Sequence, residues 1–429
     1  MESKAMTTII HQHHEYERVR YFTRGTVVLV VLAAAGAVGY VYRLLFGLEA
    51  ATNLDNQYAW GLWIAVDVAS GVALAAGGFT TAALADIFHK EEYHVFVRPA
   101  LLTAMLGYTF VVVGLLADLG RYYNVWHPML PTMWQGNSAL FEVGMCVMIY
   151  LTVLYIEFLP IVVERFKGQV NLPGILSYAN SLVESWLTVA ARYLGRFISL
   201  FIVAGVVLSC LHQSSLGTLM VIAPNKMHPL WYTNVLPVLF LLSAIAVGFP
   251  MVIFESILTN RSLKCKPETG ALSSIAVYVP ILLGVYLGVK VVDLTIRDAI
   301  PYLFDGSAAS VSYWIEILAG VVAPILLLSN PRIRRSVTGL FIAAALVVGG
   351  VVLNRINVFL VAYQPLYPIR PYFPSFLEIM VTIGLISTLV LIFRWIVMTF
   401  PVLTTEECIE RVGIMNNRRQ PAGRTEPAP

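Results

Sequence analysis

The sequence contains few charged side chains for its length. Only 12% of its 429 residues are Asp, Glu, Lys or Arg, whereas 58% are hydrophobic. A soluble domain carries roughly a quarter charged residues. Several apolar runs reach about 20 residues, which is the length a helix needs to cross a hydrocarbon core about 30 Å thick. The scarcity of charge therefore argues against a soluble protein and predicts an integral membrane protein.

Cysteine and histidine are too scattered to form the usual redox centres. The cysteines Cys146, Cys210, Cys265 and Cys408 show no CxxC or comparable spacing, which argues against an iron–sulfur cluster or a zinc site. A b-type haem in a membrane bundle needs two histidines that face each other on neighbouring spans. Only His212 lies near a predicted span. We therefore expect no haem, no iron–sulfur cluster and no metal site in this chain. The net charge of +3 gives no sign of a nucleic-acid partner.

The apolar runs are continuous rather than alternating, which predicts transmembrane helices. We expect an all-α polytopic membrane protein with about ten spans, near residues 25–46, 60–87, 98–119, 138–163, 196–212, 232–259, 272–292, 309–329, 335–353 and 377–400. Residues 176–195 are amphipathic and either lie along the membrane interface or extend the fifth span. The polar N-terminus is too long and too acidic for a signal peptide.

The spans divide the chain into four predicted parts. These are a cytoplasmic N-terminal segment (1–24), helices one to five (25–212), helices six to ten (213–400) and a disordered cytoplasmic tail (401–429). Most Lys and Arg residues fall in one set of alternate loops, so the positive-inside rule places both termini in the cytoplasm of a bacterial inner membrane. The outward loops are rich in Trp, Tyr and Pro. They are typical either of a docking surface for a partner or of an ordinary interfacial aromatic belt.

Polar side chains recur near the outward ends of helices two to five. The fifth apolar run ends in His212 and three further polar residues, and ionisable groups in spans are costly unless they serve a function. The predicted layer consists of Trp60, Asp67, Asp118, Arg121, Asn137, Glu142, His212, Gln213, Ser214, Ser215 and His228. Such a layer suits an amphipathic ligand with carbonyl or hydroxyl groups on an apolar ring, and a quinone has that form.

Simpler interpretations of this layer stay open. Asp118 and Arg121 are three residues apart, which favours a structural ion pair on one helix face. Asp67 is equally compatible with bracing nearby backbone, and His212 with a hydrogen-bonded histidine at the interface. Glu142 is harder to explain in this way, because a carboxylate two turns into a span needs a partner or a proton.

A second set of titratable side chains lies deeper in the predicted spans. Tyr108 is in the middle of the third helix, and Glu157 is in the inner half of the fourth. Asp86 and Glu255 lie near the inner ends of the second and sixth helices. Together with Glu142 these groups are expected to form a proton relay from the cytoplasm to the outer layer. An interfacial carboxylate is the plainer reading of Asp86.

The same segments resemble the NrfD/PsrC-type membrane subunits, in particular the ten-helix branch typified by HybB. The resemblance covers roughly residues 25–400. It rests on AWGLWIAVDVASGVALAAGGF, HVFVRPALLTAMLGYTF, ADLGRYYNVW, NSALFEVGMCVMIY, HQSSLGTLM, KMHPLW, VIFES, SYWIEI and YFPSFLE. It implies NrfD-like helix bundles and a haem-free subunit that takes menaquinone as its substrate.

The resemblance also implies partners and roles. It implies a periplasmic iron–sulfur subunit of the four-cluster ferredoxin type, and beyond it a hydrogenase or a molybdopterin-like or cytochrome module. Family residues that match Tyr108, Glu142 and Glu255 are implicated in proton movement. The sequence has AWG where PWG is common before the second helix, so both a hydrogenase complex and a menaquinone reductase complex stay open. A passive membrane anchor for an extracytoplasmic enzyme and an ion transporter are the alternative functions.

Overall fold

The structure is a computed structural model that describes residues 19–171, 173–368, 370–403, 408 and 412. Within these residues, ten helical stretches are long and apolar enough to cross a membrane, which confirms the predicted all-α polytopic fold. Residues 1–18 of the predicted N-terminal segment and most of the predicted tail lie outside the described residues.

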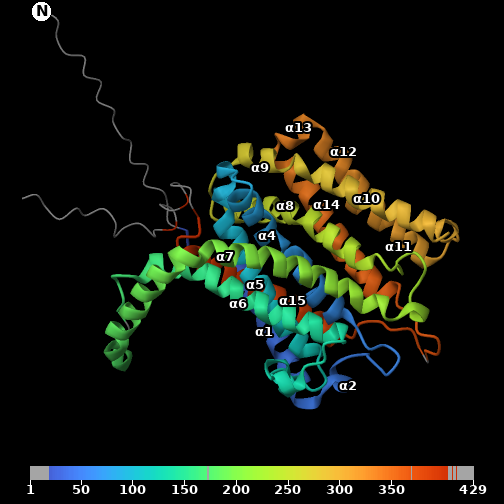
Figure 1. Ribbon diagram of the computed structural model, residues 1–429, viewed down its shortest axis with the longest axis horizontal. Coiled ribbons are helices and arrows are strands. Elements are labelled where there is room, and N and C mark those ends of the chain that lie inside the picture. Colours follow the sequence, from blue (N-terminus) through green and yellow to red (C-terminus); the bar gives the residue numbers. More distant parts are fainter. Residues whose placement is uncertain (1–18, 172, 369, 404–407, 409–411, 413–429) are drawn as a thin grey trace, which may run out of the picture.

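The ten spans follow one another along the chain as predicted (Figure 1). Several are built from two or more helical pieces, because π-helical turns interrupt the second, eighth and ninth spans. Their bounds are α1 (Arg24–Phe46), η1, α3, α4 and η2 (Trp63–Ile87), α5 (His94–Asp118), α6 (Ala139–Phe166), α7 (Asn180–Val221), α8 (Leu236–Ser262), α9 and α10 (Thr269–Ile296), α11, η10 and α12 (Ala308–Ser329), α14 and η11 (Val337–Val361), and α15 (Phe376–Thr399).

The two ends of the bundle differ in their connections. The loop face is the end that carries the connections 47–62, 119–138, 222–235, 297–307 and 362–375. The basic face is the opposite end, with the connections 88–93, 167–179, 263–268 and 330–336. Two short helices, α2 (Leu48–Ala51) and α13 (Pro331–Arg334), lie in or beside these connections. These names describe the bundle without reference to the sides of a membrane.

The fifth span differs from the prediction, which ended it at residue 212. Helix α7 (Asn180–Val221) continues for nine residues from His212 to its end, about 14 Å at 1.5 Å per residue. The polar residues do not end the helix, because Ser214 and Ser215 donate hydrogen bonds to carbonyls of their own helix. His212 therefore lies inside the bundle, and the predicted boundary between residues 212 and 213 falls within α7.

The predicted amphipathic segment 176–195 extends the fifth span rather than forming a separate helix. α7 has 42 residues and would be about 63 Å long if straight. Its first turns bend away from the other helices and project beyond the body of the bundle (Figure 1). The rest of α7 packs along α6 and α8.

The first and last spans pack directly against each other. α1 and α15 approach so closely at Gly36 and Gly384 that a Cβ atom on Gly36 would lie 2.5 Å from the Cα atom of Gly384. Such a contact is possible only for glycine on both helices. On the basic face, a disulfide joins Cys265, after α8, to Cys408 near the C-terminus. Cys146 and Cys210 are free and half-buried.

Candidate functional site

A buried contact between α5 and α7 forms the centre of the candidate site. The Nδ1 atom of His212 lies 3.2 Å from the hydroxyl oxygen of Tyr108, and both side chains are completely buried. Tyr108 is ten residues before the end of α5 and His212 nine before the end of α7, so both lie about 14 Å below the loop face. The Nε2 atom of His212 has no hydrogen-bond partner among the described residues.

The contact continues toward the basic face through a second tyrosine. The rings of Tyr108 and Tyr150 meet edge to face, with centroids 4.5 Å apart. Ser209 is fully buried on the preceding turn of α7, and its hydroxyl finds no hydrogen-bond partner within the described chain. A Cβ atom on Gly205, one further turn along, would lie 2.7 Å from Oε1 of Glu157. Tyr108 of α5 and Tyr150 and Glu157 of α6 thus follow one another along the side of α7 that carries His212, Ser209 and Gly205.

A cavity of about 300 Å³ opens beside Glu157 between the second span, α5, α6 and α7. Its walls are mostly aliphatic, and its polar lining is Tyr150, Glu157, Asp86 and Arg98. Oε1 of Glu157 is buried and makes no hydrogen bond to any described residue. Asp86 is 3.8 Å from His94 at the start of α5. The structure therefore brings four predicted residues, Tyr108, His212, Glu157 and Asp86, into one column that ends near the basic face.

The two polar residues that follow His212 in α7 make different hydrogen bonds, one to another span and one within α7. Nε2 of Gln213 donates a 2.7 Å hydrogen bond to the carbonyl of Val72 in the second span, and its buried Oε1 is left without a described partner. Ser214 is half-buried and bonds its own helix. Gln213 therefore joins the second span to the column through α7, whereas no hydrogen bond of the Ser214 hydroxyl to another span is found in the described part of the chain.

Glu142 does not occupy the buried position that the sequence suggested. It lies in the first turn of α6, not two turns into the span, and its side chain is exposed. Helix α6 begins at Ala139 with Ser138 as its cap, one residue after the predicted start, so Glu142 is only about one turn from the helix end. Asn137 precedes the cap and is also exposed. A carboxylate at this place is favoured by the positive end of the helix dipole, so it needs no buried partner.

Asp67 and Asp118 belong to a separate cluster on the other side of α5. Oδ2 of Asp67 accepts a 2.6 Å hydrogen bond from Thr382 of α15. Oδ1 of Asp118 is buried and has no partner among the described residues, although Arg43 and Glu378 act on it electrostatically. Arg43 itself donates hydrogen bonds to the carbonyls of Ala117 and Leu119 at the end of α5. The structure thus does not bring these two aspartates to His212.

The predicted pairing of Asp118 with Arg121 is wrong. No ion pair joins them in the described part of the chain, and Arg121 is exposed. The spacing of three residues places two side chains on one face only within a helix, and α5 ends at Asp118. Arg43 of α1 takes the place beside Asp118 that the sequence assigned to Arg121.

Trp60 and His228 lie near the loop face, away from the column. The ring of Trp60 packs against Phe359 and Tyr363, with centroids 6.5 and 5.7 Å away. The backbone of His228 donates to the carbonyl of Ala362, which ties the connection 222–235 to the end of η11. Burial lowers the pKa of His228, and nearby Asp305 partly opposes this. Both residues join segments of the loop face rather than the column.

Glu255 occupies a site of its own near the basic face. Its Oε2 atom accepts a 2.5 Å hydrogen bond from Thr103, and its buried Oε1 atom has no partner in the described chain. A cavity of about 40 Å³ beside it is lined by Ser256, Thr259 and Asn260 among others. Glu255 packs against the opposite side of α5 from the cavity beside Glu157, so the two carboxyls do not share a cavity.

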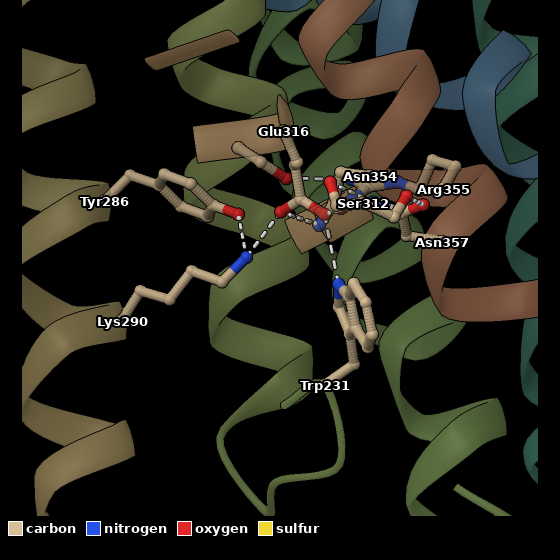
Figure 2. Close-up of polar contacts among 9 residues, drawn as sticks. Trp231, Tyr286, Lys290, Ser312, Glu316, Asn354, Arg355 and Asn357 are labelled. Carbon is tan, nitrogen blue, oxygen red and sulfur yellow. Dashed lines mark hydrogen bonds and ion pairs between the residues drawn. The ribbon is translucent and has the colours of Figure 1, made fainter. Parts of the chain in front are cut away.

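Sequence reasoning missed a buried polar network around Glu316. Nζ of Lys290 lies 2.5 Å from Oε1 of Glu316, and both side chains are almost completely buried (Figure 2). Oε1 also accepts from Asn354, and Oε2 accepts from Trp231 and Asn357, at 2.8 to 3.0 Å. The Glu316 hub, as we call these five residues, therefore joins α10, α11, α14, η11 and the connection before α8.

A second buried cation lies beside the hub. The guanidinium of Arg355 stacks on the ring of Phe240 at 3.7 Å and donates to Asn354 and Ser243. The sequence carries a signal for the ion pair of the hub: Lys290 falls within the predicted seventh span, and Glu316 lies in the SYWIEI segment of the eighth. Arg355 falls two residues beyond the predicted ninth span, which ended at residue 353.

Comparison with known proteins supplies the family. The family model described as "Polysulphide reductase, NrfD" matches residues 50–366 of this chain, so α1 and α15 lie outside the match. A protein of Nitratidesulfovibrio vulgaris without a descriptive name is 37% identical, over 89% of this chain and 95% of its own length.

Two further relatives have names that describe a function. The probable Ni/Fe-hydrogenase 2 b-type cytochrome subunit of Escherichia coli is 31% identical, over 85% of this chain and 88% of its own. The menaquinone reductase integral membrane subunit of Nitratidesulfovibrio vulgaris is 26% identical, over 79% of this chain and 81% of its own.

Proposed function

The chain belongs to the NrfD family, and on this premise we propose that it is the quinone-reactive membrane subunit of a respiratory oxidoreductase complex. Menaquinone is the proposed substrate, since one relative is named as a subunit of a menaquinone reductase. A relative named as a hydrogenase subunit supports a role beside a separate catalytic subunit. The proposed location is the bacterial inner membrane, with the basic face and both termini in the cytoplasm.

The contact between His212 and Tyr108 carries this proposal. Quinone reduction adds two electrons and two protons, so a quinone site needs hydrogen-bond donors for the carbonyl oxygens and a source of protons. The free Nε2 atom of His212 is available to a carbonyl oxygen of the ring, and Nδ1 is already held by Tyr108. Gln213 follows His212 in α7. Its side-chain carbonyl oxygen is free and can accept a hydrogen bond from a quinol hydroxyl.

We assign proton supply to the column below this contact. Asp86 lies near the basic face, Glu157 lines the cavity of about 300 Å³, and the tyrosines connect that cavity to His212. Glu255 and Glu142 keep the proton-transfer roles that the family resemblance implies, at separate places in the bundle. In this proposal Asp67, Asp118, Trp60 and His228 act indirectly, by holding the spans and connections around the column in place.

We assign electron exchange to a partner on the loop face. The connection 119–138 exposes large apolar side chains, among them Tyr123, Trp126, Met129, Met133 and Trp134. Exposed apolar groups of this size on a loop are typical of a docking surface. A periplasmic iron–sulfur subunit of the four-cluster ferredoxin type, linked to a hydrogenase or a molybdopterin-like or cytochrome module, is the proposed occupant.

The test uses the intact complex, purified through this chain. His212→Ala removes the ring that faces the proposed substrate. Thr152→Ala, an exposed residue of α6 whose hydroxyl bonds its own helix, is the matched control. We expect His212→Ala to assemble normally and to lose menaquinone turnover, with the control unaffected. Unchanged quinone kinetics in His212→Ala would favour a passive anchor, and solute uptake without quinone would favour a transporter.

A further inference from the structure

Helix α7 is much longer than a membrane crossing requires. About 20 residues cross a hydrocarbon core of about 30 Å, and α7 contains 42. Its loop-face end is fixed at Val221, so roughly the last 20 residues cross and the first part lies beyond the core. We name residues 180–196 the α7 arm. Figure 1 shows this part turning aside from the other spans at the basic face.

The α7 arm exposes a continuous apolar stripe. Leu182, Trp186, Val189 and Tyr193 follow one another at steps of four, three and four residues, which places them on one side of the helix. Their side chains are 59, 67, 47 and 56% exposed. Leu187, on another side of the same turns, is buried. The stripe therefore faces away from the protein and needs an apolar environment of another kind.

Basic side chains flank the stripe. Arg192 and Arg196 are exposed and make no ion pair or hydrogen bond with any described residue, and Lys167 is exposed where α6 ends nearby. The acidic groups of the region are already engaged. Glu184 accepts from the backbone of Gly168, and Glu164 pairs with Arg98. The free charge beside the stripe is therefore positive.

We propose that the α7 arm lies in the headgroup layer of the membrane and binds anionic phospholipids through Arg192 and Arg196. An aromatic and aliphatic stripe with arginines at its edge is the pattern of a helix that lies in the interface plane. The stripe enters the acyl boundary, and the two guanidinium groups meet the phosphates of acidic lipids. A zwitterionic lipid surface also covers the stripe, but it has no net negative charge to balance the two arginines.

The experiment reads the environment of Trp186 in the intact complex. The complex is reconstituted in phosphatidylcholine vesicles that contain an equal fraction of either brominated phosphatidylglycerol or brominated phosphatidylcholine. The difference in fluorescence between the native chain and Trp186→Phe isolates this residue from the other tryptophans. We expect brominated phosphatidylglycerol to quench Trp186 more strongly than brominated phosphatidylcholine does.

Charge variants give the decisive comparison. The double variant Arg192→Gln/Arg196→Gln is expected to lose the preference for phosphatidylglycerol. Arg332→Gln/Arg335→Gln, two exposed arginines in another connection of the basic face, is expected to keep it. Equal quenching by the two lipids, or a preference that survives in Arg192→Gln/Arg196→Gln, overturns the proposal. Absence of quenching by both lipids also overturns it and identifies a protein or water as the neighbour of the stripe.

Discussion

The imidazole of His212 and the phenol of Tyr108 lie 3.2 Å apart at equal depth in two neighbouring spans, and no part of either side chain is exposed. Each side chain limits what the other can do. With Nδ1 engaged by the phenol, the histidine presents only Nε2 to any ligand. The tyrosine in turn packs on Tyr150, so its hydroxyl has little freedom to turn elsewhere. If His212 takes part in the reaction with menaquinone, a substitution of Tyr108 should therefore also change turnover.

Tyr108→Phe removes the hydroxyl and keeps the ring. If Tyr108 passes protons to the site at His212, we expect menaquinone turnover to fall on the order of 10²-fold, as when a general acid is lost. Turnover of the assembled complex is the measurement. Tyr155→Phe is the matched control, because this tyrosine of α6 is exposed and its hydroxyl lies 3.0 Å from that of Thr109. Native turnover in Tyr108→Phe would remove this tyrosine from the proposed relay.

Gly205→Ala tests the position of Glu157. The new methyl group would lie 2.7 Å from the carboxyl oxygen, so the end of a flexible side chain must move while the backbones stay in place. We expect slower proton uptake in proteoliposomes, similar to that of Glu157→Gln, with little change in thermal stability. Gly195→Ala, where nothing lies within 4 Å, should leave uptake unchanged. Normal uptake in Gly205→Ala would show that the carboxyl needs no fixed position there.

The fold was predictable because hydrophobic length alone identifies spans. All ten spans occur where apolar runs of about 20 residues occur. The end of α7 was not predictable in this way, because hydropathy treats His212 and the residues after it as surface groups. In the structure they bond within their helix or to neighbouring spans, and these contacts depend on tertiary packing. The same limit applies to Glu142, whose exposure follows from where α6 begins.

The partners of charged residues were the least predictable feature. The sequence favoured Arg121, three residues away, as the partner of Asp118, but Arg43 from the distant first span lies beside it. Lys290 and Glu316 are 26 residues apart in two different spans, and only the fold brings them together. A local pattern can show that a charge lies in a span, but the partner comes from a neighbouring helix that the pattern does not identify.

Gly36→Ala tests the contact between the first and last spans. Its Cβ atom would lie 2.5 Å from the Cα atom of Gly384 and 3.0 Å from the carbonyl of Met380. These are backbone atoms, so the helices must separate, and overpacking of this kind costs about 1–3 kcal/mol. We expect a lower melting temperature in detergent. Gly349→Ala, which meets nothing within 4 Å, should melt like the native chain. Equal melting of both variants would show that α1 and α15 separate without cost.

The Glu316 hub predicts a large effect on stability. Glu316→Ala leaves the ammonium group of Lys290 buried without its carboxylate, and breaking a buried pair in this way costs about 3–5 kcal/mol. Thermal unfolding of the purified complex in detergent is the measurement, and Thr295→Ala, an exposed residue of α10 that bonds its own helix, is the control.

The double variant Lys290→Met/Glu316→Leu separates the ion pair from the rest of the hub. It removes both charges together, so the penalty of an uncompensated buried charge disappears. The remaining loss of stability comes from the side-chain N–H donors of Asn354, Asn357 and Trp231, which lose the carboxylate that accepted their hydrogen bonds. We therefore expect the double variant to be more stable than Glu316→Ala and less stable than the native chain. A double variant as unstable as the sum of the two single variants would show that the two charges do not depend on each other.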